Sequence, residues 1–157
     1  MKFEEFVCFE ATIPQLQAKD RDGAITELVA ALVGAGKIPS ESGKEVTKAV
    51  IKRENEASTG MGKGVAVPHV KHAVVKTVIA AVGHSAAGID FASLDEQPVY
   101  SVILLVSPVD NPDKHLQAME NIFRHLQKER FRKFLRQCRN AEDLRDLLNE
   151  ADENPSW

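Results

Sequence analysis

The apolar residues of the N-terminal third follow the spacing of amphipathic helices. One stripe with helical spacing follows Asp22-Gly23, and Gly34 and Gly36 close it. Its members are Ile25, Leu28, Val29, Leu32 and Val33. The segment Ser42-Gly43-Lys44-Glu45 has the pattern of a capping box, so we expect it to open a second helix that ends near Arg53-Glu54.

The middle of the chain carries apolar runs in place of helical stripes. Val65-Ala66-Val67 predicts a short strand, and the β-branched and alanine-rich stretch from Val74 to Val82 predicts another. The stretch from Val99 to Val106 is almost continuously apolar. Such a run is typical of a central strand that is covered on both faces.

Helical spacing returns in the last third. Asn111-Pro112-Asp113 predicts a helix start, because it supplies a capping side chain, a proline at the first position and an acid in the first turn. The buried stripes expected for three successive helices are Leu116, Met119, Phe123 and Leu126, then Phe131, Phe134, Leu135 and Cys138, then Leu144, Leu147 and Leu148 after a cap at Asn140. We expect residues from about Glu150 to Trp157 to form a frayed tail.

Helices interleaved with strands predict a layered α/β domain, with residues 1–150 as the domain and 151–157 as its tail. The 157 residues, 43% apolar and 27% charged, are enough for one globular domain with its own core. The net charge of −3 argues against a nucleic-acid binder. No apolar run is long enough to cross a bilayer, and the acidic N-terminus lacks the apolar core of a signal peptide. Cys8 and Cys138 are isolated, so free thiols in a reducing cytoplasm are expected, and we predict a cytoplasmic protein that is not membrane-inserted.

The residues best suited to catalysis or ligand binding lie between Arg53 and His69. Gly60, Gly62 and Gly64 have no Cβ, so their backbone N–H groups can approach a phosphate closely. The loop matches neither nucleotide motif, because GxxxxGK[ST] and GxGxxG are both incomplete. A tight turn that leads into a strand is the alternative interpretation of these glycines.

His69 follows Pro68, which defines the direction in which the chain leaves the strand. An imidazole with a pKa of roughly 6.5 is mostly neutral at cytoplasmic pH, so one ring nitrogen is free to attack phosphorus. Arg53, Ser58 and Thr59 can donate hydrogen bonds to the phosphoryl oxygens. Because positioning and charge stabilisation dominate phosphoryl transfer, neither a metal nor a cofactor is required.

Other interpretations of His69 are a structural histidine or half of a metal pair with His72. HxxH after a strand places the two side chains poorly on one face, and no carboxylate or thiolate cluster completes a metal site. A hydrolase based on Ser58 lacks the GxSxG motif.

His115 lies in the first turns of the helix that begins at Asn111-Pro112. It precedes Leu116 of the expected stripe, so we place it at the helix edge, near the strand ends and the positive end of the helix dipole. A solvent-facing histidine is the alternative. Lys63, His72, His84 and His125 receive no role, and we expect these three histidines to be surface or packing residues.

Together these residues resemble a known family. Arg53-Glu54, Ser58-Thr59-Gly60 and the run from Gly62 to His69 are similar to the active-site signature of phosphotransferase-system (PTS) enzyme IIA domains of the fructose, mannitol and nitrogen class. Pro98-Val99, the run from Leu104 to Pro108 and His115-Leu116 resemble the second conserved block of that family. The resemblance covers nearly the whole chain, to about Leu148.

The resemblance implies a mixed, largely five-stranded β-sheet flanked by α-helices. It implies that phosphorylated HPr, charged from phosphoenolpyruvate through enzyme I, phosphorylates His69, that His115 supports the phosphorylated ring, and that Arg53 helps to hold the phosphoryl group. We also expect Ser58, Thr59, Gly62 and Gly64 to bind phosphate. Lys63, Lys71-His72, Asp110 and Asp113 introduce charges that can alter phosphate affinity.

Two functions share this site. A phosphocarrier passes the group from His69 to the IIB component of a sugar transporter carried on another chain. A nitrogen-type regulatory IIA protein instead uses its phosphorylation state to control binding to a target protein. A domain that binds partners without phosphorylation is a third interpretation, which Arg53, His69 and His115 argue against.

Overall fold

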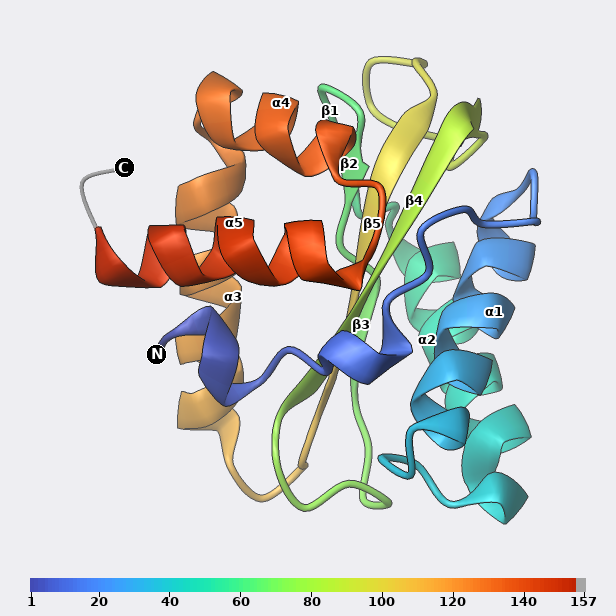
Figure 1. The fold of residues 1–157 in the computed structure, drawn as a ribbon. Coiled ribbons are helices and arrows are strands. Elements are labelled where there is room, and N and C mark those ends of the chain that lie inside the picture. Colours follow the sequence, from blue (N-terminus) through green and yellow to red (C-terminus); the bar gives the residue numbers. More distant parts are fainter. Residues whose placement is uncertain (155–157) are drawn as a thin grey trace.

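A mixed sheet of five strands separates two layers of helices in the computed structural model, which describes residues 1–154 (Figure 1). The strands are β1 (Gly60–Gly62), β2 (Val65–Ala66), β3 (His69–Lys71), β4 (Ile79–Ile89) and β5 (Val99–Ser107). The α-helices are α1 (Arg21–Gly34), α2 (Gly43–Glu56), α3 (Pro112–Leu126), α4 (Glu129–Gln137) and α5 (Ala141–Glu153). Short 3₁₀ turns occupy Phe3–Glu5, Phe9–Ala11 and Ser40–Ser42. The α/β prediction and the five-stranded sheet are confirmed.

β5 is the central strand of the sheet. β4 pairs with it in antiparallel orientation along one edge, and β2 and β3 pair with it in parallel orientation, one after the other. β1 pairs with β2 and forms the outer strand beyond it. Pairing is interrupted between Ala66 and His69, where Pro68 has no N–H to donate. The Pro68 carbonyl accepts a hydrogen bond from the Leu105 N–H at 3.0 Å, and His69 then pairs with Leu105 as the first residue of β3.

The continuous apolar run of β5 reflects burial on both faces. Val102, Leu104 and Val106 belong to a core shared with α1 and α2, whereas Ile103 and Leu105 belong to a second core on the α3, α4 and α5 side. Successive side chains of a strand point to opposite faces, so a strand between two helix layers must be apolar at both. Figure 1 shows the two layers on either side of the sheet.

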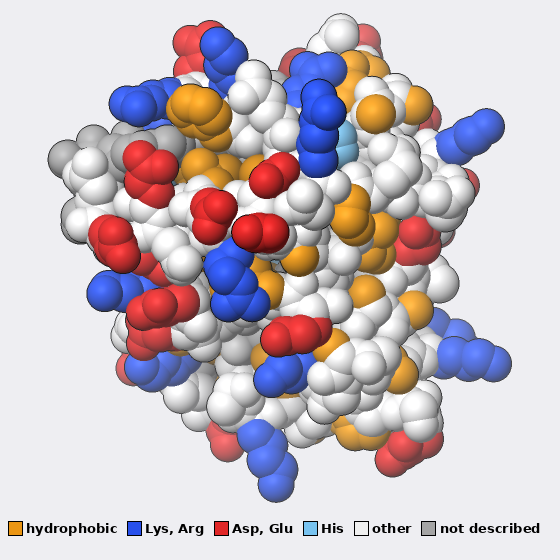
Figure 2. Space-filling model, in the orientation of Figure 1, with side chains coloured by type: hydrophobic (Ala, Val, Ile, Leu, Met, Phe, Trp, Pro, Cys, Tyr) orange, Lys and Arg blue, Asp and Glu red, His pale blue; other side chains and the backbone are white. Residues whose placement is uncertain are grey.

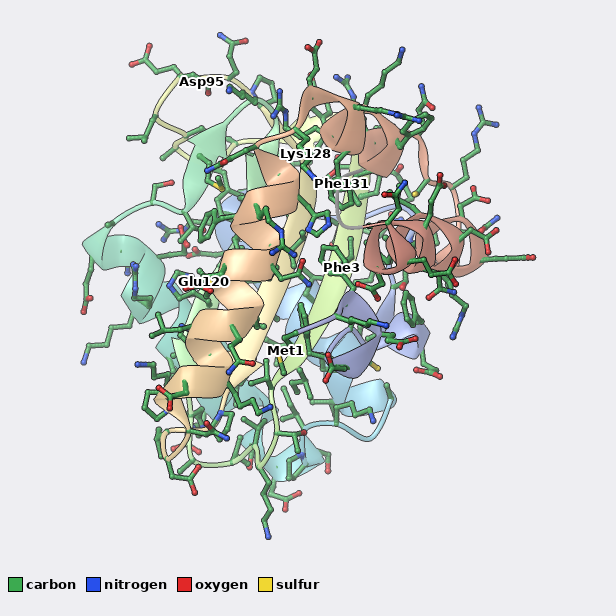
Figure 3. The ribbon with its side chains drawn as sticks, turned by 90° about the vertical axis from the view of Figure 1, so that its left-hand side faces the viewer. Met1, Phe3, Asp95, Glu120, Lys128 and Phe131 are labelled. Carbon is green, nitrogen blue, oxygen red and sulfur yellow. The ribbon has the colours of Figure 1, made fainter. Side chains whose placement is uncertain are left out.

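The N-terminal segment joins the second core. The Asp152 carboxylate of α5 accepts the N–H groups of Phe3 and Glu4, at 2.8 and 3.0 Å. Figure 3 labels Phe3 and Phe131 on the side where α3, α4 and α5 meet. Their rings are stacked with centroids 5.9 Å apart, and both contact the buried imidazole of His125.

Several local predictions need correction. α1 begins at Arg21 with Asp20 as its cap, one residue before Asp22. The Ser42 side chain forms no capping hydrogen bond, because a 3₁₀ turn leads into α2 at this point. The strand predicted from Val74 begins at Ile79 as β4, and residues 73–78 form a turn and irregular backbone.

The predicted stripe of α3 is wrong at Leu116 and right at Leu126, which is buried, while Met119 and Phe123 are partly buried against the second core. Leu116 is 57% exposed, and the buried residues of this helix are His115, Ala118, Asn121, Ile122, His125 and Leu126. The polar members are buried because each finds a hydrogen-bond partner: Ser107 for His115, the Met1 carbonyl for Asn121, and the Asn121 carbonyl for His125. Apolar spacing alone cannot reveal such partners.

The predicted frayed tail also changes. α5 continues through Glu153, and Ala151 is buried, so the helix extends past the expected boundary at residue 150. Residues 155–157 lie outside the described residues. Within residues 1–154, no helix combines the length and the apolar character needed to span a membrane.

Candidate functional site

The position of His69 follows from the interruption beside β5. Because pairing pauses at Pro68, the Val67 carbonyl is available to the His69 ring, and it lies 2.8 Å from Nδ1. A carbonyl only accepts hydrogen bonds, so Nδ1 carries the proton and donates it. Nε2 therefore holds the free lone pair of the ring. The sequence predicted that the strand ends at Pro68. The structure shows an interruption of pairing there instead, and β3 begins beside β5 at His69.

His115 approaches His69 from α3. The ring centroids of the two histidines are 5.7 Å apart, with an angle of 44° between the ring planes. The Nδ1 atom of His115 is hydrogen-bonded to the Ser107 hydroxyl at 2.7 Å, which fixes the ring against the end of β5. His115 is buried rather than at an exposed helix edge, which corrects that prediction. The structure nonetheless brings the two histidine rings side by side.

Both imidazoles are held in the neutral form. Burial lowers the pKa of His69 below its ordinary value, and the charges of Arg53 and Lys71 lower it further. The Val67 carbonyl and the Glu54 carboxylate act in the opposite direction. Burial, followed by the charges of His69 and Lys71, lowers the pKa of His115 to about 4. At neutral pH, Nε2 of His69 is thus available as a nucleophile.

Arg53 lies in the last turn of α2, and its charge acts on His69. Its Nη1 atom donates to the Ala57 carbonyl at 3.2 Å, so the helix end orients the guanidinium. The group has five N–H donors, which leaves several for an anion beside His69. The side chain of Lys71 is exposed, and its charge acts on both site histidines.

The two hydroxyls predicted to bind phosphate have other partners. Ser58 Oγ donates to the Phe91 carbonyl and accepts the Gly60 N–H, both at 3.0 Å. Thr59 donates its backbone N–H and its hydroxyl to the Glu54 carboxylate. Neither hydroxyl has a free proton to donate, so both build the loop. The prediction of phosphate contacts for Ser58 and Thr59 is therefore corrected.

The predicted phosphate contacts of Gly62 and Gly64 also fail. The Gly64 carbonyl accepts the N–H groups of Tyr100 and Ser101 at the start of β5, whereas His69 pairs with Leu105 near its end. Four residues of strand correspond to roughly 13 Å. Both glycines have positive φ, +88° and +82°, so they shape the tight β1–β2 turn that was the alternative interpretation.

The remaining histidines lie outside this pair. His72 accepts the Val74 N–H and lies 3.8 Å from Glu45, and His84 Nδ1 lies 3.3 Å from the Pro14 carbonyl. His125 is buried between two phenylalanine rings. No group of three or more metal-ligating side chains occurs within residues 1–154. Cys8 and Cys138 are both free thiols.

Sequence reasoning gave no separate role to two supporting residues, Glu54 and Ser107, although both lie within the motifs that it used. Glu54 is only 2% exposed, and it follows Val46 and Val50 at intervals of four residues, so its place on the buried face of α2 was visible in the spacing. Ser107 ends the apolar run of β5, but nothing in the sequence indicates which residue it contacts. Its partner is decided by the path of the chain into α3.

The chain matches a known protein family over most of its length. The model of the family described as "Phosphoenolpyruvate-dependent sugar phosphotransferase system, EIIA 2" matches residues 7–151. The chain belongs to this family. It is therefore a phosphotransferase-system component, and the resemblance stated from its motifs is confirmed.

Relatives within the family differ in their names and lengths. The chain is 31% identical over 152 residues to a PTS system fructose-specific EIIABC component of Bacillus subtilis, covering 97% of this chain but 24% of that protein. It is 31% identical over 148 residues to a nitrogen regulatory protein of Bradyrhizobium diazoefficiens, covering 94% and 95% of the two chains. The crystal structure of the nitrogen regulatory protein IIA-Ntr from Neisseria meningitidis superposes with a TM-score of 0.82 at 25% identity, covering 92% and 97%.

Proposed function

We propose that this IIA domain is a phosphocarrier in which His69 accepts a phosphoryl group and passes it on. The observation that carries the proposal is the 2.8 Å contact between His69 Nδ1 and the Val67 carbonyl, which leaves Nε2 unprotonated and free. Arg53 supplies positive charge beside it for the transferred group.

The transfer exchanges one N–P bond for another. The lone pair of His69 Nε2 attacks phosphorus on the phosphohistidine of the donor, HPr, and the N–P bond of the donor breaks. The donor phosphohistidine reacts with its other ring nitrogen protonated, so it departs as a neutral imidazole. The His69 ring keeps its Nδ1 proton on the Val67 carbonyl and takes over the positive charge together with the phosphoryl group. The Val67 carbonyl stabilises the positive charge that develops on the His69 ring during the attack.

His115 supports the phosphorylated ring in this proposal. When the Ser107 hydroxyl donates to Nδ1 of His115, the proton of the neutral ring resides on Nε2. That N–H then faces the space beside His69 and can donate to a phosphoryl oxygen.

Two exposed apolar side chains lie close to His115 in the sequence. Val109 precedes the helix that carries His115, and Leu116 directly follows His115; they are 55% and 57% exposed. Both offer apolar contact area to a protein partner.

The acceptor that we propose is the IIB component of a sugar transporter on a separate chain. The Bacillus relative supports this choice, because its name joins A, B and C components in one protein. A cytoplasmic location fits both the donor and the acceptor. We expect phosphotransfer to IIB to leave the chain ready for another cycle.

A nitrogen-type regulatory function is the second candidate. It is favoured by the nitrogen regulatory protein of Bradyrhizobium, which matches this chain over nearly the full length of both. In that case the charge added at His69 would control binding to a target protein. Onward transfer distinguishes the two candidates: a carrier loses its phosphoryl group to a IIB domain within one reaction cycle, whereas a regulator retains it.

The test is incubation with enzyme I, HPr and phosphoenolpyruvate, followed by intact-mass measurement. One acid-labile phosphoryl group should appear, and the His69→Ala variant should show none. His84→Ala is the matched control, because His84 is a histidine outside the pair, and it should be labelled like the wild type. Undiminished labelling of His69→Ala would refute the assignment.

A further inference from the structure

A hollow lies at the end of the sheet opposite to His69 and His115. It is lined by Lys and Arg side chains that the proposed phosphocarrier function does not use. It has a volume of about 830 Å³ and lies between the Pro14 segment, β4 and α4. A smaller hollow of about 220 Å³ adjoins it beside Tyr100 and shares three of its lining residues. We call the two together the basic groove, defined by Lys63, Arg132, Lys133, Arg136 and Arg139.

The basic groove is positively charged, whereas the net charge of the whole chain is −3. Glu129 is the acid that lines the larger hollow, and Asp95 lines the smaller one, where it accepts the N–H groups of Lys63 and Gln97. The Cys138 thiol contributes no charge, because burial raises its pKa to about 11. Among residues 1–154, none of the five cations of the groove forms an ion pair.

Two of the arginines are held in place by uncharged groups. The guanidinium of Arg136 lies 3.6 Å above the centre of the Tyr100 ring, and Arg132 Nη1 donates to the Leu126 carbonyl at 2.8 Å. These contacts orient the side chains without neutralising them. Because Arg132 and Arg136 are four residues apart on α4, they lie on the same face of the helix, about 6 Å apart along its axis.

The basic groove is remote from His69. It contacts β5 at Tyr100 and Ser101, whereas His69 pairs with Leu105. In Figure 3, the labelled Asp95 and Lys128 lie at the end of the molecule where α4 is, and α3, which carries His115 in its first turn, begins at the opposite end. Figure 2 shows Lys and Arg side chains over α4 and acidic ones over α5 below it. A partner on the groove therefore leaves the histidine pair accessible.

We propose that the basic groove binds an extended acidic segment of a partner protein. Side chains at alternate positions of an extended segment are about 6.6 Å apart, which matches the axial spacing of Arg132 and Arg136. The groove is open to solvent, whereas a small-molecule site encloses most of its ligand. A single-stranded nucleic acid needs exposed aromatic faces for its bases, and Arg136 already covers the face of Tyr100.

The test uses fluorescence anisotropy with a labelled peptide of alternating Glu and Ser, ten residues long. The wild-type protein should bind it, with affinity falling steeply as KCl is raised from about 50 to about 500 mM. Lys133→Glu/Arg139→Glu, both at exposed positions, should weaken binding at least about tenfold. The matched control is Lys48→Glu/Lys52→Glu on α2, which changes the net charge equally and should alter binding less than about twofold.

Two further probes decide the class of partner. A peptide of the same length with Gln in place of Glu should not bind, and a deoxythymidine decamer should bind more weakly than the acidic peptide. Equal loss of binding in the α2 control, or tighter binding of the decamer, would overturn the proposal. Phosphorylation of Lys133→Glu/Arg139→Glu at His69 should stay at the wild-type rate, so this outcome is separate from the fate of the phosphocarrier function.

Discussion

At the scale of single residues, the environment of the His69 ring is set by its immediate neighbours along the chain. Pro68 interrupts strand pairing, the Val67 carbonyl is thereby left for Nδ1, and Nε2 is left free. The sequence motif thus encodes a tautomer as well as a position. Burial and the nearby cations keep the ring neutral below the pH at which a free imidazole would protonate.

His115 provides the first prediction at this scale. In His115→Ala, HPr should still phosphorylate His69, because Nε2 and the Val67 contact remain. Transfer in both directions should slow by about tenfold to a hundredfold, since the N–H donor that orients the phosphoryl group is lost from the transition state that both directions share. Rapid-quench measurement of both directions checks this.

His72→Ala is the control for that measurement, because His72 follows the same strand but contacts Glu45 and Val74. Its rates should match those of the wild type. Unchanged transfer in His115→Ala would show that the second histidine is only a packing residue.

At the scale of elements, α3 delivers His115 to the site from its first turn. The helix start is fixed by Asn111, whose side chain accepts the Lys114 N–H at 3.3 Å. Asn140 caps α5 in the same way, accepting the Asp143 N–H at 2.7 Å, but neither Asn140 nor its partner contributes to the histidine pair. The two caps therefore separate a stability effect from an effect on the site.

Asn111→Ala and Asn140→Ala should each lower the free energy of unfolding by about 1 kcal/mol, measured by urea denaturation. Only Asn111→Ala should also slow phosphoryl transfer, because the first turn of α3 positions the His115 ring. The transfer rates are compared at a urea-free condition in which both variants are folded. Equal rates in the two variants would contradict a positioning role for the α3 start.

At the scale of the whole molecule, the two ends of the sheet carry different chemical groups. The histidine pair lies near the end of β5 and the basic groove lies near its start. The second core also carries a buried histidine, His125, whose pKa is lowered mainly by burial. Together with His69 and His115, whose pKa values are also lowered mainly by burial, it makes the stability of the domain depend on pH.

Acidification should destabilise the folded protein. A histidine whose pKa is lowered on folding binds its proton more readily in the unfolded chain, so stability is complete above about pH 6.5 and is lost as the pH falls. For His115 the loss runs down to about pH 4, at up to about 1.4 kcal/mol per pH unit. Urea denaturation at about pH 7.5 and about pH 5 measures it.

His125→Phe is the informative variant for this measurement, because it removes one buried titrating group from between Phe3 and Phe131. Its stability should depend less on pH than that of the wild type. A wild-type stability that is constant or rises between the higher and the lower pH would contradict the prediction.

Much of this protein could be predicted from local pattern. Local sequence patterns predicted α1 from its helical stripe, β5 from its continuous apolar run and the start of α3 from the cap at Asn111. Each pattern depends only on residues that are close together in the chain. The roles expected of Arg53, His69 and His115 came from a family resemblance, and the comparison confirms the family.

Only the tertiary structure decided which groups meet across the sheet. Ser58 and Thr59 turned inward to Phe91 and Glu54, and the turn of Gly62 and Gly64 took the opposite end of β5 from His69. His115 and His125 became buried because α3 found partners for them in other parts of the chain. Such contacts depend on packing between distant segments, which no local spacing records. The sequence by itself determined the candidate nucleophile, His69, and the order of the elements. The packing of the helices against the sheet determined the surroundings of His69 and the place where the unpaired positive charge gathers.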